Sequence, residues 1–338
     1  MSEHWDQADD ESRNPHDALF KGIFVDPAQA ALLVRLSLPI DPGQVDLSLL
    51  EARPGEHIDP DLKERRSDLV FELSLPGDGP ALRLVFEHQS APERDVLYLA
   101  HAYLERLWDR WCRAGGSRTA LPPCVVTVLF QGPGPWTGPK RLSEQVILPP
   151  GELGELLAAH QPDLVLRFVE LGLLTYAELR ALEGPALGIL ALMLLKAGPS
   201  RDLRPAWAAA GELVLQARRA SLAGYQLLVR YTVRVGNEEH MARLQDDLLQ
   251  AHGPEAVEPF VSAAQAWHAE GRAEGHAEGH AEGRVEEARA FLVELLTTKF
   301  GPLPPDVLER VSSASVEEAR LWFRRALSAT TLAEVFSG

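Results

Sequence analysis

The stretch RSDLVFELSLPGDGPALRLVFEHQ, residues 66–89, decides the fold. Two runs of alternating apolar residues flank PGDGP at residues 76–80, which is rich in turn-forming residues, so the stretch predicts an antiparallel hairpin. With Leu75 opposite Pro80, the numbers of facing residues sum to 155. The pairs in this register match in chemistry on both faces: Leu69 with Phe86, Phe71 with Leu84, Leu73 with Leu82, Val70 with Val85, and Glu72 with Arg83.

Two carboxylates meet at the open end of this hairpin. The same register places Asp68 directly opposite Glu87, with Gln89 on the same face of the second strand. Like charges in directly opposed positions destabilise a strand pair, so a structural role explains them poorly. A divalent cation between them would remove the repulsion, because hard cations prefer oxygen ligands. The sequence therefore predicts a metal site here.

The composition indicates a globular protein. With 338 residues, of which 46% are hydrophobic, the chain can bury the cores of one large domain and a smaller one. The net charge of −16 argues against nonspecific coating of nucleic acid but allows a local basic groove. Cys112 and Cys124 form neither a disulfide framework nor a CxxC pair. The first residues lack an apolar signal segment, and the longest apolar run, residues 186–195, is too short for a bilayer, so we expect a cytoplasmic protein with no membrane span.

Helical patterns lie on both sides of the hairpin. Asn14-Pro15 predicts an N-cap followed by proline at the first helical position, and a second helix is expected from about residue 28 to residue 36. After Gln89, residues 90–93 open a further helix with apolar residues at helical spacing. Its other face carries four arginines, Arg94, Arg106, Arg110 and Arg113.

The middle of the chain predicts an α/β fold. Residues 125–130 form a continuous apolar run that suits a buried strand. A helix between two strands implies a crossover connection and some parallel pairing. Residues 164–171 fit one more strand, and a short helix fits them almost equally well. From residue 176 to about residue 250 the pattern is helical, and we expect these helices to cover the sheet.

Residues 267–284 contain the repeat HAEG-RAEG-HAEG-HAEG-R. On a helix, the glycines would form a slowly winding stripe, each destabilising the helix by about 1 kcal/mol relative to alanine. The glutamates at i,i+4 spacing would repel one another. Two interpretations stay open: a flexible hinge, or a helix that a partner helix stabilises by close approach along the glycines. We favour the second, which predicts a homo-oligomer.

The pattern after the repeat indicates a separate small helical unit. An apolar stripe around residues 291–296 ends at Gly301-Pro302, and Ser315 with Glu318 forms a capping box before another helix. We therefore expect four parts: a disordered acidic tail at 1–13, a main domain with its helical cover at 14–250, a linker with the repeat helix at 251–284, and a small helical domain at 285–338.

Several short motifs together resemble a known family. They are HDALFK at 16–21, RSDL at 66–69, EHQS at 87–90, Tyr103, and the run from VVTVLFQG to a tryptophan at 125–136. Over about residues 14–241 they resemble the recombination-promoting nuclease / putative transposase family, which belongs to the PD-(D/E)XK nuclease superfamily. The C-terminal unit resembles a helical domain of unknown function that is often appended to such proteins.

The resemblance implies a PD-(D/E)XK-type core, a mixed sheet of αβββαβ topology flanked by helices, and Mg²⁺- or Mn²⁺-dependent cleavage of DNA. Asp68 and Glu87 would be the metal ligands, Gln89 would occupy the position of the superfamily lysine, and Asp17 would be the acid of the first helix. Gln89 carries no charge, so it could orient the attacking water or a ligand but could not act as a lysine does. Asp17 fits an ion pair with Lys21 equally well.

The remaining polar residues near these motifs have plainer roles or serve as contact candidates. We expect His16 and His88 to pack or form hydrogen bonds and to transfer no proton. The candidates for DNA contact are Arg94, Arg106 and Lys21, and a solvated helix face is the alternative for the arginines.

Two functions compete at this point. The first is a Mg²⁺-dependent DNA endonuclease linked to recombination or mobile elements. The alternative is a catalytically silent DNA-binding or assembly protein that oligomerises through the glycine-repeat helix. An ATP-dependent phosphoryl transferase is disfavoured, because the sequence has no GxxxxGK[ST] loop.

Overall fold

The computed structural model describes residues 14–39, 45–53, 69–77, 79–93 and 95–336, with the backbone alone at residue 264 and at residues 266–284. The chain divides into two compact units, residues 1–264 and residues 265–338. Each unit has a hydrophobic core of its own. Across the described ranges, no helix has both the length and the apolar composition needed to cross a membrane.

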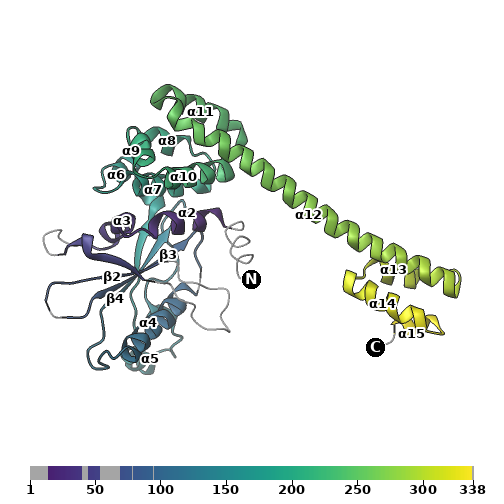
Figure 1. Ribbon diagram of the computed structural model, residues 1–338. Coiled ribbons are helices and arrows are strands. Elements are labelled where there is room, and N and C mark those ends of the chain that lie inside the picture. The colour runs from purple at the N-terminus through teal and green to yellow at the C-terminus, as the bar shows by residue number, and fades with distance from the viewer. Residues whose placement is uncertain (1–13, 40–44, 54–68, 78, 94, 337–338) are drawn as a thin grey trace. The chain divides into compact units, whose positions relative to one another are not determined.

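The first unit is built on a five-stranded mixed sheet whose strands lie side by side in chain order (Figure 1). The strands are β1 (Leu50–Arg53), β2 (Leu69–Leu73), β3 (Leu82–Gln89), β4 (Cys124–Phe130) and β5 (Arg167–Glu170). β2 pairs antiparallel with β1 and β3, whereas β4 pairs parallel with β3 and β5. All five residue pairs predicted for the hairpin are present, so its register is confirmed.

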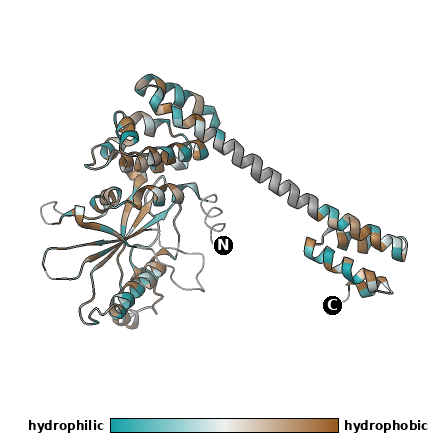
Figure 2. Ribbon diagram, viewed as in Figure 1, coloured by the Kyte–Doolittle hydropathy of each residue, from teal (hydrophilic) through white to brown (hydrophobic). Residues whose placement is uncertain are grey.

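Two helices before the sheet pack on one of its faces. In α2 (Pro15–Phe24), the Asn14 side chain accepts hydrogen bonds from the first backbone N–H groups and proline follows it, as predicted. Asp26 caps α3 (Pro27–Ser37) in the same way. Both helices share a core with Phe71 and Phe86 of the sheet and with α7 (Ala186–Ala197). α7 is apolar on all sides, brown in Figure 2, and almost wholly buried.

The helix α4 (Val96–Arg113) covers the opposite face. Its residues Leu97 and Leu104 share a core with Val85 and Val126 of the sheet. The helix begins at residue 96 and not at residues 90–93 as predicted, because β3 remains extended to Gln89 and the chain must then turn to reach the other face. Gly115 follows the helix with φ +94, a conformation that favours glycine.

Further helices form an outer layer over α2 and α7, and thus cover the sheet through these two helices and not directly (Figure 1). They are α6 (Tyr176–Arg180), α8 (Arg204–Ala210), α9 (Leu213–Ala220), α10 (Leu222–Val235) and α11 (Glu238–His252). Trp207 packs against Tyr225 and Phe260 inside this cover, with ring centroids 5.9 and 5.7 Å apart. Along the chain, the first unit thus contains the helices α2 and α3, the antiparallel strands β1 to β3, the helix α4 and the parallel strand β4.

Some short elements differ from the prediction. The sequence does not predict β1, because β1 buries only Leu50 and shows no apolar alternation. The helix α5 (Glu152–Ala158) buries only Gly154 and was not predicted either. In residues 164–171 the strand interpretation is confirmed by β5, and the short-helix interpretation is wrong, because the 3-10 turn after β5 begins only at Leu171. The 3-10 helices are η1 (Leu47–Leu49), η2 (Leu142–Gln145), η3 (Leu171–Leu173) and η4 (Gly198–Ser200).

The repeat is helical. The helix α12 (Pro254–Phe300) runs through residues 267–284 without a break, so the backbone there is helical, and stabilisation of this segment by a partner helix stays a prediction. Leu292 and Leu296 at its end form the core of the second unit with three further helices, including Val311 and Trp322. These are α13 (Pro305–Ser312), α14 (Val316–Ser328), which begins with the predicted capping box, and α15 (Leu332–Phe336).

Candidate active site

The strand β3 presents the predicted motif at its carboxyl end. Side chains alternate along a strand, so Glu87 and Gln89 share the face of Val85, which packs toward α4. His88 shares the face of Phe86, which packs toward α2. Glu87 and Gln89 are half-buried, whereas His88 is only 7% exposed. The carboxylate and the amide are therefore accessible together on one face of the sheet.

Two of the predicted residues lie outside the described part of the chain. They are Asp68, the proposed partner of Glu87, and Arg94. The described register ends one pair earlier, at Leu69 and Phe86. The metal interpretation of the carboxylate pair therefore stays a prediction.

Asp17 lies in the first turn of α2 and forms the predicted ion pair. Its carboxylate accepts a hydrogen bond from Lys21 Nζ at 2.7 Å, which is the alternative role that the sequence offered. α2 packs on the face opposite to that of Glu87. Asp17 nevertheless lies close enough to His88 for its charge to raise the pKa of that imidazole, against the larger lowering by burial.

The two histidines form hydrogen bonds, as expected. His88 Nε2 lies 2.9 Å from Gln131 Oε1, and Gln131 Nε2 lies 3.0 Å from His16 Nδ1. His16 Nδ1 also lies 2.8 Å from the hydroxyl of Tyr231. The ring of His88 stacks on Phe20, with centroids 5.4 Å apart. These contacts join β3, the end of β4, α2 and α10 through three buried side chains and the half-buried His16.

Burial keeps both imidazoles neutral. Desolvation lowers the pKa of His88 to about 4 and also lowers the pKa of His16. The same cause raises the pKa of the Tyr231 hydroxyl. Neither histidine is therefore set up to gain a proton near neutral pH, in agreement with the hydrogen-bonding role that we expected.

Gln131 and Tyr231 were missed by the sequence reasoning. Gln131 follows the apolar run of β4 directly, and its burial to 1% exposure is the opposite of what a polar residue at a strand end suggests. Tyr231 lies in an amphipathic helix at a position that suits an ordinary core residue. Only the fold brings them together, since Tyr231 is 215 residues from His16.

The predicted site offers donors that suit a hard cation. The Glu87 carboxylate and the Gln89 amide oxygen are the oxygen ligands that Mg²⁺ accepts, and Asp68 would supply a second carboxylate. Among the residues with described positions, no group of three or more His, Cys, Asp or Glu side chains converges as a metal cluster.

Of the candidates for DNA contact, Arg106 and Lys21 are described. Arg106 lies in α4, on the face of the sheet that carries Glu87, and is half-buried. Lys21 belongs to the ion pair with Asp17. The two side chains thus project from helices on opposite faces of the sheet.

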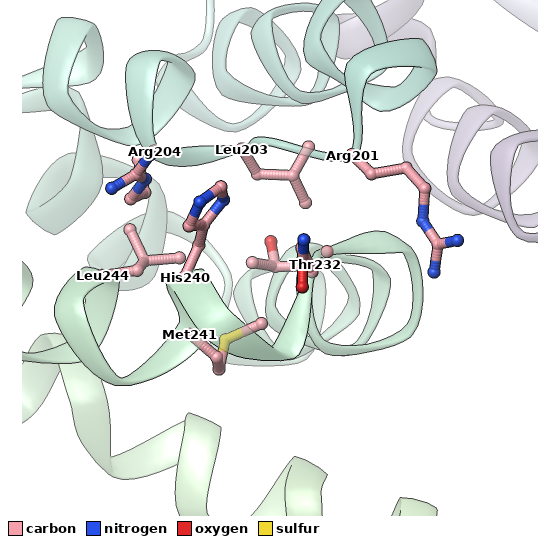
Figure 3. A pocket seen from close by; sticks show the side chains of 9 residues that line it. Arg201, Leu203, Arg204, Thr232, His240, Met241 and Leu244 are labelled. Carbon is pink, nitrogen blue, oxygen red and sulfur yellow. The ribbon is translucent and has the colours of Figure 1, made fainter.

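A small pocket lies elsewhere, between α8, α10 and α11. Figure 3 shows Arg204, Thr232, His240 and Met241 among the side chains that line it. Asp202 binds Arg204 through two hydrogen bonds and lies 3.6 Å from His240. The cavity of about 10 Å³ holds at most one water molecule, so it suits no substrate.

Comparison with known proteins identifies relatives for most of the first unit. The model of the family described as putative transposase, YhgA-like, matches residues 14–219. The recombination-promoting nuclease RpnC of Escherichia coli K12 is 28% identical over 120 residues, which are 35% of this chain and 39% of that protein. RpnD of E. coli O157:H7, another recombination-promoting nuclease, is 29% identical over 129 residues, 36% of this chain and 48% of that protein.

A third relative carries a different description. The inactive recombination-promoting nuclease-like protein RpnE of E. coli K12 is 27% identical over 118 residues, 35% of this chain and 38% of that protein. The chain thus spans less than half the length of these curated relatives. No solved structure matches it significantly.

Proposed function

The chain belongs to the family of YhgA-like putative transposases, and proteins similar to it are described as recombination-promoting nucleases. We therefore propose that it is a metal-dependent DNA endonuclease with a PD-(D/E)XK-type core. The order of helix, three antiparallel strands, helix and parallel strand supports such a core. The observation that carries the proposal is the position of Glu87 and Gln89, side by side on one face at the carboxyl end of β3.

Mg²⁺ or Mn²⁺ would be held by Glu87 and Asp68. When bound, the cation supplies an activated water and stabilises the charge that develops on the scissile phosphate. Glu87 contributes a carboxylate from the strand β3, and Gln89 contributes an amide that can orient water without carrying charge. Arg106 on α4 is the described arginine that we assign to phosphate contact, and we assign Arg94 to the same role.

Plasmid cleavage tests this proposal. Purified full-length protein should nick supercoiled plasmid in Mg²⁺ or Mn²⁺ and should lose the activity in EDTA. Asp68→Ala and Glu87→Gln should each lower the rate about 100-fold or more, because each removes charge from the metal site. Glu105→Gln, on the exposed part of α4, is the matched control and should cleave normally. Equal nicking by wild type and Glu87→Gln would reject the assigned site.

The uninterrupted helix through the repeat supports a second candidate, a DNA-binding assembly protein without catalysis. We propose that residues 267–284 associate between copies, since their glycines permit close helix approach. Light scattering on the full-length protein should then give a mass above 37.1 kDa, and replacing Gly271, Gly275, Gly279 and Gly283 by alanine should lower it. A monomeric wild type rejects assembly, whereas metal-dependent cleavage rejects the silent role.

The proposed site of action is the cytoplasm, where the DNA substrate lies. The two cysteines of the chain are free thiols in the structure, which suits a reducing compartment. Fractionation of cells that express the tagged protein should place it with the soluble cytoplasmic proteins. Recovery in the membrane fraction or outside the cell would contradict this location.

A further inference from the structure

A chain of hydrogen bonds between buried and half-buried side chains approaches the predicted site from behind the sheet. It consists of Tyr231, His16, Gln131 and His88, which we call the polar chain. Three of these side chains are less than 10% exposed, and each lies in or against the apolar core around α2 and α7. Polar groups in such a core are costly unless they bond to one another, so their arrangement is tightly constrained.

The donors and acceptors along the polar chain are consistent. His88 Nε2–H donates to Gln131 Oε1, and Gln131 Nε2–H donates to His16 Nδ1. The Tyr231 hydroxyl lies 2.8 Å from the same Nδ1, so it and the Gln131 amide share the single lone pair of that nitrogen. The carbonyl of Leu194, 3.5 Å from the Tyr231 hydroxyl, is a second acceptor for its proton. These contacts need no charged group.

The polar chain touches the candidate site through residues adjacent to its members. His88 lies between Glu87 and Gln89 on β3, and His16 directly precedes Asp17. Gln131 holds β3 twice, since its side chain accepts from His88 and its backbone N–H donates to Gln89 O at 2.9 Å. An imidazole fixed from behind prevents rotation of the strand and thereby fixes the direction of the flanking side chains.

We propose that the polar chain positions the carboxyl end of β3, so that Tyr231 and Gln131 are positioning residues for Glu87 and Gln89. The side chains of Tyr231 and Gln131 lie on the α2 side of the sheet, opposite to the face that carries the side chains of Glu87 and Gln89. Tyr231 also lies outside residues 14–219, which the family model matches. The kinetic part of this inference rests on the proposed function, whereas its structural part does not.

The structure offers a matched pair of substitutions. Tyr231 and Tyr225 both lie in α10, both are buried, and each has its shortest hydroxyl contact at 2.8 Å. The hydroxyl of Tyr231 also lies 3.5 Å from the carbonyl of Leu194. The hydroxyl of Tyr225 donates to the carbonyl of Ala256, in the helical cover and away from β3. Tyr231→Phe therefore removes one bond of the polar chain, and Tyr225→Phe removes an equivalent bond outside it.

Cleavage kinetics test the positioning role. We expect Tyr231→Phe to lower kcat about tenfold with KM for DNA within about twofold of wild type, as is typical when a group supporting a catalytic residue is lost. Tyr225→Phe should keep both constants within about twofold. Gln131→Met, with a side chain of similar length, should reproduce the loss and provides the test if Tyr231→Phe does not fold. Equal kcat values for the two Tyr→Phe variants would overturn the inference.

Hydrogen exchange separates this inference from the proposed function. Amides of residues 87–89 should exchange at least about threefold faster in Tyr231→Phe than in Tyr225→Phe, in the absence of metal and DNA. If the wild type cleaves no DNA, the nuclease proposal fails, and the exchange rates alone decide the positioning role. Faster exchange confined to this strand end supports it. Unchanged exchange there overturns it, whatever the activity.

Discussion

Among the individual residues, Gly198 leaves the space that two side chains of the polar chain occupy. Gly198 follows α7, and a Cβ atom there would lie 2.4 Å from both Gln131 Nε2 and the Tyr231 hydroxyl. Its φ of −49 is open to any residue, so close packing and not backbone conformation requires glycine. The close packing of Gln131 and Tyr231 therefore depends on the absence of a side chain at Gly198.

Gly198→Ala should displace Gln131 or Tyr231 and destabilise the first unit. Overpacking of this kind costs about 1–3 kcal/mol of unfolding free energy, which urea denaturation measures. The matched control is Gly134→Ala, because a Cβ atom at Gly134 meets nothing within 4 Å. The control should stay within about 0.5 kcal/mol of wild type. A loss of the same size in both variants would contradict the steric explanation.

His88 should make the stability of the first unit depend on pH. Burial lowers its folded-state pKa to about 4, below the ordinary value of 6.5, so the unfolded chain binds the proton first as the pH falls. Stability is complete above about pH 6.5 and decreases toward pH 4, by about 2 kcal/mol between pH 7 and pH 5. Urea unfolding at the two pH values should show this loss, and His88→Gln should show less of it. The same pH dependence in both proteins would exclude His88 as the cause.

The site residues illustrate how far a sequence reaches at this scale. The positions of Glu87 and Gln89 on one strand face followed from alternation alone. Asp17 had two readings, and the structure shows the ion pair with Lys21. The roles of Gln131 and Tyr231 had no local signal, since their bonds depend on the packing of α2 and α10 against the sheet. Side-chain partners far apart in the chain are fixed by tertiary structure.

Among the elements, the edge strand β1 and its neighbour β2 show how the sheet accommodates like charges. Glu51 of β1 lies directly opposite Glu72 of β2. Arg53 forms ion pairs with both carboxylates, and Arg83 of β3 pairs with Glu72 from the other side. Opposed carboxylates in this sheet can thus be neutralised by arginine. The repulsion argument for a metal between Asp68 and Glu87 consequently gains its weight from the family and not from charge alone.

Arg53→Ala should therefore destabilise the sheet through the charges of Glu51 and Glu72. The side chain of Arg53 is 44% exposed, so we expect a loss of only about 0.5–1 kcal/mol, which shrinks in high salt. Denaturation at 20 mM and 500 mM NaCl measures both effects. Arg113→Ala is the control, because its pair with Asp109 is exposed and should contribute nothing measurable. A loss for Arg53→Ala that does not change with salt would indicate packing instead.

The sequence predicted those helices and strands whose apolar residues recur in a clear pattern. The hairpin register was determined by five matching pairs, and the strand at residues 125–130 by its apolar run. β1 escaped prediction because three of its four residues are exposed, so that it owes its strand conformation to pairing with β2. The start of α4 was misplaced because helical spacing alone does not show where an extended strand ends. A helix or strand with a weak burial pattern can be recognised only when the elements that pack against it are known.

On the scale of the whole molecule, the chain maintains separate cores. Phe260, near the start of α12, is fully buried in the core of the first unit, and Leu292, near the end of the same helix, is fully buried in the core of the second. The repeat between them was predicted to be a weak helix on its own. The start of α12 is thus stabilised by packing in the first unit, and its end by packing in the second unit.

Core substitutions at the two ends of α12 should therefore act on different units. Leu292→Ala should cost the second unit about 2–5 kcal/mol, and Phe260→Ala should cost the first unit about 3–5 kcal/mol. Hydrogen exchange of peptides from α13–α15 and from α8–α11 reports each unit separately. Phe291→Ala is the control, because Phe291 is 54% exposed and should change neither. If Leu292→Ala accelerated exchange in α8–α11 as much as in α13–α15, the two units would unfold as one. The division between residues 264 and 265 would then not separate two independently stable units.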